Sequence, residues 1–245
     1  RRGRSAKWCR RAATSACTLS DPNVPDFIKP DVVVFASGRG SNFAALLDAQ
    51  KHEKLPIRIC ALLSDKPAAP ALDIARDAGI AAITLAPRDF ADRASFDRAL
   101  FARAAQFHPD LIVLAGYMRV IDAGAIADWH GKIVNIHPSL LPAFRGLDTH
   151  ARVLAAGVRF TGCTVHFVRA EMDDGPIIVQ AAVPVLAGDD AERLAARVLA
   201  AEHRAYPLAL RLIAEGRVRV REERVEIAGA AGADTCLLNP PEAAR

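Results

Sequence analysis

The sequence predicts a single α/β domain, in which a mostly parallel sheet is flanked by helices and followed by an antiparallel C-terminal part. Short apolar runs alternate with longer amphipathic stretches from Asp31 onward, an order typical of a parallel sheet covered by helices. The early runs are apolar throughout, as expected of strands buried on both faces. Two later strand-like runs follow each other without a helix between them, which favours antiparallel pairing. With 245 residues the chain is long enough for one large domain, which we expect at residues 31–227.

The first half of the chain repeats a strand-then-helix unit. The run "VVVFA" is apolar and β-branched, and the stretch "NFAALLDAQ" after it has apolar residues at helical spacing. Gly79 is a stop signal for the second helix, because glycine readily adopts the left-handed conformation that closes a helix. Strands are expected at residues 32–36, 57–64, 81–86 and 110–116, and helices at residues 42–50, 71–79 and 94–107.

The second half begins with the strand "KIVNIH" at residues 132–137 and then changes character. The runs "RFTGCTVHFV" and "PIIVQAAVPV" are the expected antiparallel pair, and a long helix with Pro207 inside it follows. A bend is expected there, because proline lacks the backbone donor of a regular helix. The remaining elements are the strands at residues 159–168 and 176–185, the helix at 189–216 and a closing hairpin at 217–220 and 224–229.

The two ends of the chain differ in composition from the body. Residues 1–20 contain six Lys or Arg residues and no acid, which resembles a transit peptide, but they lack the apolar stretch of a secretory signal. We therefore expect residues 1–30 to be a disordered or non-native N-terminal extension. Gly, Ala and Pro dominate residues 228–245, which we expect to be a flexible tail.

Charge and hydropathy exclude two classes of partner. The net charge is +4, so the chain after the six basic residues of the extension carries a net charge of −2. A basic footprint for nucleic acid is therefore missing from the folded body, and no nucleic-acid partner is expected. No apolar run approaches the roughly 20 residues that a membrane span requires, so no membrane association is expected either.

The five cysteines are odd in number and widely spaced, with no Cys-x-x-Cys motif and no Cys/His cluster at metal spacing. Reduced thiols in a cytosol-like compartment are the simplest interpretation, so we expect a cytoplasmic protein without a metal site. Cys163 lies near polar residues in the sequence, but a buried packing role is favoured over a nucleophile.

A glycine-rich loop joins the first strand to its helix, in the stretch "SGRGSN" at residues 37–42. Glycines allow a ligand close to the backbone, and the free amides and dipole of the helix start favour an anion such as phosphate. Neither a dinucleotide fingerprint nor a P-loop fits, because Phe43 stands where the former needs glycine and the Gly-Lys-Ser/Thr sequence of the latter is absent. The alternative is a simple tight turn in which Ser41 caps the helix.

A second constellation lies at the end of the strand at residues 132–137. Asn135 and His137 are two residues apart, so both side chains project from one face at the edge where parallel sheets gather functional groups. Imidazole exchanges protons near neutral pH, and an amide N–H can stabilise an oxyanion. The alternative is a structural histidine bonded to the loop. Asp173 in "EMDDGP" favours chemistry, because a carboxylate beside an imidazole stabilises its charged form.

Four motifs in this order, "SGRGSN", "NIHPSLLPAFRG", "GCTVHFV" and "DDGPII", resemble the folate-dependent phosphoribosylglycinamide formyltransferase family of purine biosynthesis. The resemblance runs from about residue 32 to about residue 220. It implies a Rossmann-like formyltransferase domain, 10-formyltetrahydrofolate as co-substrate with no metal, and a monomer or homodimer. Asp148 and Asp174 depart from the common pattern, where His and Gly respectively are frequent.

The resemblance also implies roles for particular residues. Asn135, His137 and Asp173 would be catalytic, stabilising the charge that develops when the amine of glycinamide ribonucleotide attacks the formyl carbon. Gly40, Ser41, Asn42 and Glu202 would bind glycinamide ribonucleotide. Reduced folate would contact Arg93, Met118, Arg119, Val120, Ile121, Asn135, Arg169, Ala170, Glu171, Met172 and Asp173.

Three other functions remain open from the residues alone. A formyltetrahydrofolate hydrolase uses a similar site but normally carries a regulatory domain in front, and only 31 residues precede the first strand. A methionyl-tRNA formyltransferase shares the style of loop but needs an added RNA-binding domain. A non-enzymatic phosphate-binding scaffold would need the glycine-rich loop but not Asn135, His137 and Asp173.

Overall fold

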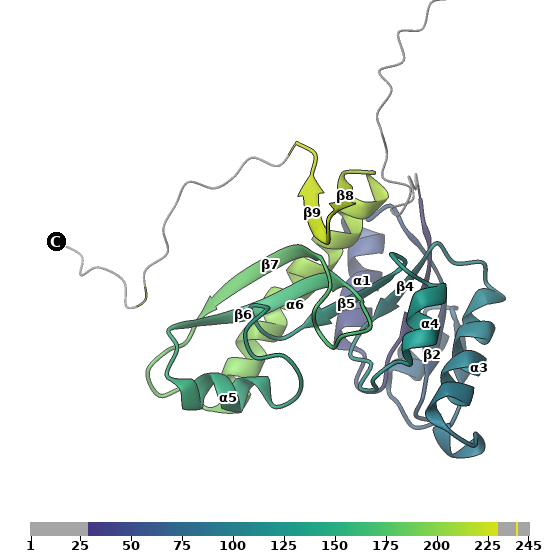
Figure 1. The fold of residues 1–245 in the computed structure, drawn as a ribbon, viewed down its shortest axis with the longest axis horizontal. Helices are drawn as coiled ribbons and strands as arrows, with labels where there is room; N and C mark the ends of the chain where they lie inside the picture. The colour runs from purple at the N-terminus through teal and green to yellow at the C-terminus, as the bar shows by residue number, and fades with distance from the viewer. Residues whose placement is uncertain (1–28, 230–238, 240–245) are drawn as a thin grey trace, which may run out of the picture.

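The computed structural model describes residues 29–229 and residue 239, so most of the expected extension at 1–30 and tail at 228–245 lies outside the described residues. The described part forms a seven-stranded sheet with the order β3-β2-β1-β4-β5-β6-β7 and a separate two-stranded hairpin (Figure 1). The expected α/β fold class, mostly parallel with an antiparallel C-terminal part, is confirmed. The strands are β1 (Asp31–Phe35), β2 (Arg58–Ser64), β3 (Ala81–Thr84), β4 (Leu111–Leu114), β5 (Ile133–His137), β6 (Phe160–Phe167), β7 (Ile177–Pro184), β8 (Val218–Arg221) and β9 (Arg224–Ile227).

The strand order places a switch point at the centre of the sheet. From β1 the chain builds β2 and β3 on one side, then crosses to β4 and β5 on the other, all in parallel. The connections that leave β1 and β4 therefore run to opposite sides, and in open α/β sheets ligands bind at the carboxyl ends of the strands at such a point. β6 and β7 continue the sheet beyond β5 in antiparallel directions.

Helices cover both faces of the sheet. Successive residues of β1 belong to different cores, since Val32 and Val34 pack on one face and Val33 and Phe35 on the other. α1 (Ser41–His52), α2 (Ala71–Asp77) and α6 (Ala191–Ala214) contribute to the first core, and α3 (Arg93–Ala105) and α4 (Ala123–Asp128) to the second. This double cover explains the apolar runs of the central strands β1 and β4.

Two helices were not expected from the sequence. α4 has six residues and begins where the Asp122 side chain accepts a hydrogen bond from Gly124. α5 (Thr149–Ala156) has eight residues and ends at Gly157, whose φ is +64°. Both are too short to show a clear helical period in the sequence. A 3₁₀ turn, η1 (Pro87–Asp89), precedes α3 and was not expected either.

The expected ends of the other helices agree with the structure. α2 closes through Gly79, which has φ +70° and donates to the carbonyl of Arg76. α6 continues through Pro207 as one helix, and the bend expected there stays a prediction. No helix within residues 29–229 combines the length and apolar character needed to cross a membrane.

Candidate active site

The glycine-rich loop between β1 and α1 leads directly into the first turn of the helix. Gly40 is the residue that precedes α1, its φ is +78°, and no side chain caps the helix. The alternative interpretation, in which Ser41 caps the helix, is therefore wrong, because Ser41 is the first helical residue. The amides of the first turn have no partner within the helix, so this end can receive an anion.

Gly40 is required by two independent constraints. Its positive φ is costly for any residue with a Cβ, and a Cβ added there would lie 2.7 Å from the Cβ of Ala71 in α2. Gly38 in the same loop has nothing within 4 Å of an added Cβ. The loop thus owes its shape to the second glycine.

This difference gives a prediction for stability. Gly40→Ala is expected to lower the free energy of unfolding by about 2 kcal/mol, from backbone strain and the clash with Ala71. Gly38→Ala, the matched control, is expected to change it by less than about 1 kcal/mol. Urea unfolding followed by circular dichroism measures both, and equal losses would contradict the assigned role of Gly40.

Asn42 and Glu202 come together beside this loop. The Asn42 amide donates to the Glu202 carboxylate over 2.7 Å, although the residues are 160 positions apart. Both are more than nine-tenths buried. Burial raises the pKa of Glu202, and the hydrogen bond from Asn42 opposes that shift. α6 therefore brings a hydrogen-bond acceptor next to the first turn of α1, and the sugar-binding role that the resemblance implies for Glu202 stays a prediction.

His137 ends β5 and is held through both ring nitrogens. Nδ1 lies 3.3 Å from Oδ2 of Asp173, and Nε2 lies 3.0 Å from the carbonyl oxygen of Phe144. Both oxygens are acceptors, so this geometry suits a doubly protonated ring that donates to each. The structure thus brings His137 and Asp173 together across 36 residues of sequence, within an environment where His137 is 6% exposed.

Asp173 is fixed by its own backbone and by the loop that follows β5. Its φ is +54°, and its Oδ2 also accepts a hydrogen bond from the amide of Gly146 at 2.9 Å. Gly175 anchors the same turn, because a Cβ there would lie 1.7 Å from the carbonyl oxygen of Phe167. The neighbouring Asp174 forms an ion pair with Arg145 at the surface. The carboxylate facing His137 is therefore set by a tight turn.

Asn135 contacts a residue that the sequence analysis assigned no role, His166 in β6. The antiparallel register places the two opposite each other, and Asn135 Nδ2 lies 3.3 Å from His166 Nε2. His166 Nδ1 lies 2.9 Å from the carbonyl of Phe167 and so carries the proton, which leaves Nε2 to accept from Asn135. Burial lowers the pKa of His166, which favours this neutral form.

His166 also connects the side chain of Asn135 with the pair formed by His137 and Asp173. Its Nε2 is 4.0 Å from Oδ1 of Asp173, so Asn135, His166, Asp173 and His137 form one continuous cluster. That His166 lies opposite Asn135 is evident only from the register of β6 against β5. The sequence signal was a histidine inside the apolar strand "CTVHFV", which would be costly without a partner.

Apart from Arg93 and Asn135, the residues expected to face a folate lie in two segments, 118–121 and 169–173. Residues 118–121 follow β4, whose carboxyl end pairs with β5 at Asn135. Met118 and Val120 are 64% and 53% exposed, and Met172 of the second segment is 54% exposed, whereas Ile121 is buried. Exposed large apolar side chains at a site edge are suited to a flat, apolar ligand.

Two of the arginines expected near the folate, Arg119 and Arg169, contact other residues of the protein. The Arg119 guanidinium lies 5.0 Å from the centre of the Phe96 ring, and Arg169 pairs with Glu223 of the β8–β9 turn at 2.6 Å. Arg93 is the first residue of α3. Ala170 and Glu171 are exposed in the loop before Asp173. Any contact of Arg169 with a ligand would therefore use its backbone rather than its guanidinium group.

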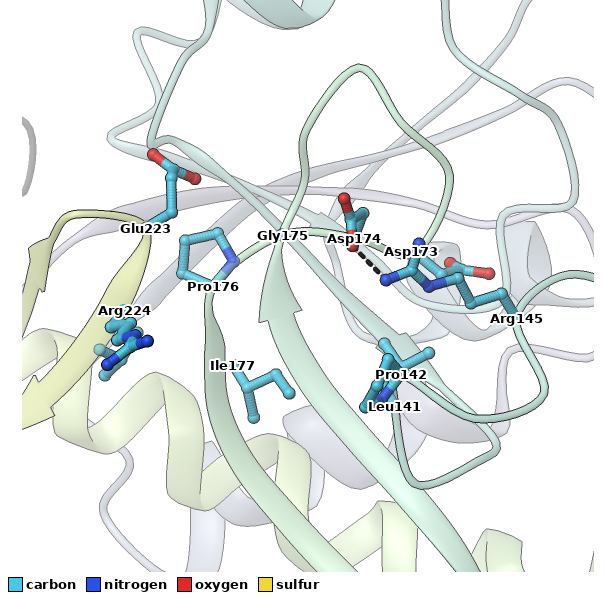
Figure 2. Close-up of a pocket in the computed structure, with 11 residues that line it drawn as sticks. Leu141, Pro142, Arg145, Asp173, Asp174, Gly175, Pro176, Ile177, Glu223 and Arg224 are labelled. Atoms are coloured by element: carbon cyan, nitrogen blue, oxygen red, sulfur yellow. Dashed lines mark hydrogen bonds and ion pairs between the residues drawn. The ribbon is translucent and has the colours of Figure 1, made fainter.

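A cavity of about 370 Å³ is lined in part by the turn that holds Asp173 (Figure 2). Its wall is built from the loop after β5, the turn at residues 173–177 and the β8–β9 hairpin, with the Arg145–Asp174 pair at its edge. Asp173 is its one residue from the predicted site. The cavity thus borders the cluster but does not coincide with the predicted folate face.

The remaining candidates have structural roles. Cys163 is fully buried in the core of α6 and the antiparallel strands, and burial raises the pKa of its thiol to about 12, so its expected packing role is confirmed. Asp148 precedes α5 with φ +54° and makes no capping bond with its side chain. Among residues 29–229 and 239, no group of His, Cys, Asp and Glu side chains has the arrangement of a metal site.

Three comparisons with known proteins show which proteins this chain is similar to. A family model described as formyl transferase matches residues 31–210. Phosphoribosylglycinamide formyltransferase of Escherichia coli is 42% identical over 199 residues, covering 81% of this chain and 94% of that protein. Glycinamide ribonucleotide transformylase 1 from Symbiobacterium toebii has a similar structure, with a TM-score of 0.80 and 46% identity over 82% of this chain and 94% of that chain.

The animal relatives are much longer than this chain. The trifunctional purine biosynthetic protein adenosine-3 of Bos taurus is 45% identical over 194 residues, which is 79% of this chain but 19% of that protein. The chain therefore spans about a fifth of the length of these trifunctional relatives.

Proposed function

This chain belongs to the formyl transferase family, and on that premise we propose that it transfers the formyl group of 10-formyltetrahydrofolate to the amine of glycinamide ribonucleotide. The product would be formylglycinamide ribonucleotide of de novo purine biosynthesis. The observation that carries the proposal is the contact of His137 with Asp173 at the end of β5, next to Asn135. We assign the activity to a formyltransferase domain at residues 31–227.

The acceptor is supported by the glycine-rich loop and α6. The free amides at the start of α1, together with Gly40, Ser41 and Asn42, suit the phosphate of a ribonucleotide. Glu202 lies beside them through its bond with Asn42 and can accept hydrogen bonds from ribose hydroxyls. A phosphate and a ribose bound here would direct the substrate's amine toward the carboxyl end of β5.

The formyl donor is supported by the exposed apolar side chains along the same edge. Met118, Val120 and Met172 offer contact to the flat ring system of a reduced folate. The donor supplies an activated formyl carbon. No metal is included in the proposal, because carbonyl polarisation can come from the hydrogen-bond donors of Asn135 and His137.

Each side chain of the cluster then has a distinct task. Negative charge develops on the formyl oxygen as the amine adds, and Asn135 retains one amide hydrogen beyond the one held by His166. The proton on Nε2 of His137, which faces the carbonyl oxygen of Phe144 in this structure, would leave that carbonyl and be donated to the developing oxyanion or, through a water, to the leaving nitrogen. Asp173 would stabilise the charged imidazole and help to organise a water that takes the proton released by the attacking amine and passes one to the leaving folate nitrogen.

The proposal is tested by measuring consumption of 10-formyltetrahydrofolate with and without glycinamide ribonucleotide. We expect consumption to depend on the ribonucleotide, with no more than about a hundredth of the rate in its absence, because productive geometry needs both substrates. Equal rates in the two reactions would instead indicate a hydrolase. Formylation of methionyl-tRNA in place of the ribonucleotide would indicate a methionyl-tRNA formyltransferase.

The expected state of the protein as a monomer or homodimer stays a prediction, as does the cytoplasmic location. Cys60 and Cys163 are free thiols, which is typical of a reducing compartment. Sedimentation of the purified chain measures the oligomeric state, and fractionation of cells that express the chain measures its location.

A further inference from the structure

The 118–121 segment is fixed at both ends by side chains from distant parts of the chain. At its start, the amide of Met118 donates to the Ser37 hydroxyl over 3.0 Å, from 81 residues away. Just beyond its end, the amide of Asp122 donates to Oδ2 of Asp97 over 2.7 Å. Ser37 is 2% exposed and Asp97 is fully buried. The segment expected to contact the donor is therefore held in place by two buried polar groups.

Asp97 is an unusual residue for a helix face that packs against the sheet. Its neighbours Phe96, Leu100 and Phe101 in α3 are core residues, yet Asp97 is buried among them as a carboxylate. Its second oxygen, Oδ1, has no hydrogen-bond partner among the described residues. Burial raises its pKa, and the charges of Arg119 and Arg93 oppose that shift. A buried carboxylate with a single bond costs stability compared with an apolar residue of similar size.

Ser37 connects this segment to the glycine-rich loop. It belongs to "SGRGSN", and its own amide donates to the carbonyl of Gly116 over 3.1 Å. Two hydrogen bonds thus join the loop proposed for phosphate to the turn that begins the donor segment. The two segments are therefore linked through one buried side chain, that of Ser37.

We propose that Asp97 and Ser37 are positioning residues for the formyl donor: Asp97 fixes the far end of the 118–121 segment, and Ser37 couples its near end to the phosphate loop. This inference rests on the proposed function and deepens it. Neither side chain needs to touch the reacting atoms, because each acts through a backbone amide of residues that line the donor face. The exposed side chains of Met118 and Val120 depend on that backbone for their direction.

The test compares Asp97→Leu with Asp97→Asn by steady-state kinetics in which both substrates are varied. Asp97→Leu removes the acceptor for Asp122 and is expected to raise KM for 10-formyltetrahydrofolate about tenfold, with KM for the ribonucleotide within about twofold. Asp97→Asn retains an acceptor oxygen and is expected to stay within about threefold of the wild type for both. Near-normal KM values in Asp97→Asn would show that Asp97 acts by accepting the hydrogen bond from the Asp122 amide.

A matched control separates positioning from loss of stability. Asp189 is also a nearly buried carboxylate that accepts a backbone amide, that of Leu186 at 2.8 Å, and it pairs with Arg197. Asp189→Leu is expected to destabilise the protein while leaving both KM values within about twofold. Ser37→Ala provides a second route if Asp97→Leu fails to fold, and it is expected to raise KM for both substrates by about threefold or more.

Three results would overturn the inference. The first is a KM for 10-formyltetrahydrofolate that stays unchanged in Asp97→Leu. If Asp97→Leu does not fold, the corresponding result is that Ser37→Ala leaves the KM values for both substrates unchanged. Another is an equal rise of the donor KM in Asp97→Leu and Asp189→Leu. The proposed function is judged separately, by transfer in the wild type. If the wild type transfers no formyl group, the affinity of the same variants for 5-formyltetrahydrofolate tests the inference instead. Wild-type protein that does not bind this folate is the third result that would contradict the inference.

Discussion

Replacement of His137 by Ala is expected to lower kcat about 10³-fold and to change both KM values by less than about fivefold. The reason is that the charged ring interacts most strongly with an oxyanion that exists only in the transition state, so its loss affects turnover rather than binding. The measurement is steady-state transfer to glycinamide ribonucleotide, with circular dichroism to verify the fold.

His150 provides the control for this variant. It lies in α5 close enough for the charge of His137 to contribute to lowering its pKa, but burial is the larger cause and it does not bond to Asp173. His150→Ala is expected to keep kcat within about fivefold of the wild type. Wild-type turnover by His137→Ala, or an equal loss in His150→Ala, would remove His137 from the mechanism.

Replacement of Asp173 by Asn is expected to lower kcat about 10²-fold. An amide in this place no longer compensates the charge of the imidazole, and its NH₂ group can face Nδ1 without a proton on the ring. His137 would then lack the second proton that the chemistry requires. Transfer rates measured at saturating concentrations of both substrates test this directly.

The adjacent Asp174 makes the matched control, since it belongs to the same turn and pairs with Arg145 at the surface. Asp174→Asn is expected to change kcat by less than about twofold, because exposed ion pairs contribute little. Similar losses of kcat in Asp173→Asn and Asp174→Asn would contradict this role, because the effect would then depend on the total charge of the turn and not on the contact of Asp173 with His137.

The strands were predictable because burial on both faces leaves a local signal. β1 and β4 are short apolar runs, and β6 and β7 follow each other without a helix, so their presence could be inferred from residue type alone. The short helices α4 and α5 could not, because six or eight residues include barely two turns. Their position depends on caps and on packing against the rest of the domain.

The chemistry of the site was only partly visible in the sequence. Asn135 and His137 could be paired because a strand fixes the direction of residues two apart. His166 and Asp97 could not, since one depends on the register of β6 against β5 and the other on a helix that meets a loop 25 residues later. The conformation of Gly40 was missed for a similar reason, because Ser41 is equally plausible as a cap when φ is unknown.

Transfer of a labelled formyl carbon is the most direct test of the central claim. The wild-type protein is mixed with 10-formyltetrahydrofolate labelled in the formyl group and with glycinamide ribonucleotide, and the products are separated and identified by mass spectrometry. We predict that the label appears in the ribonucleotide as an N-formyl group. Label found only in free formate would contradict the account, because the site would then deliver the formyl group to water.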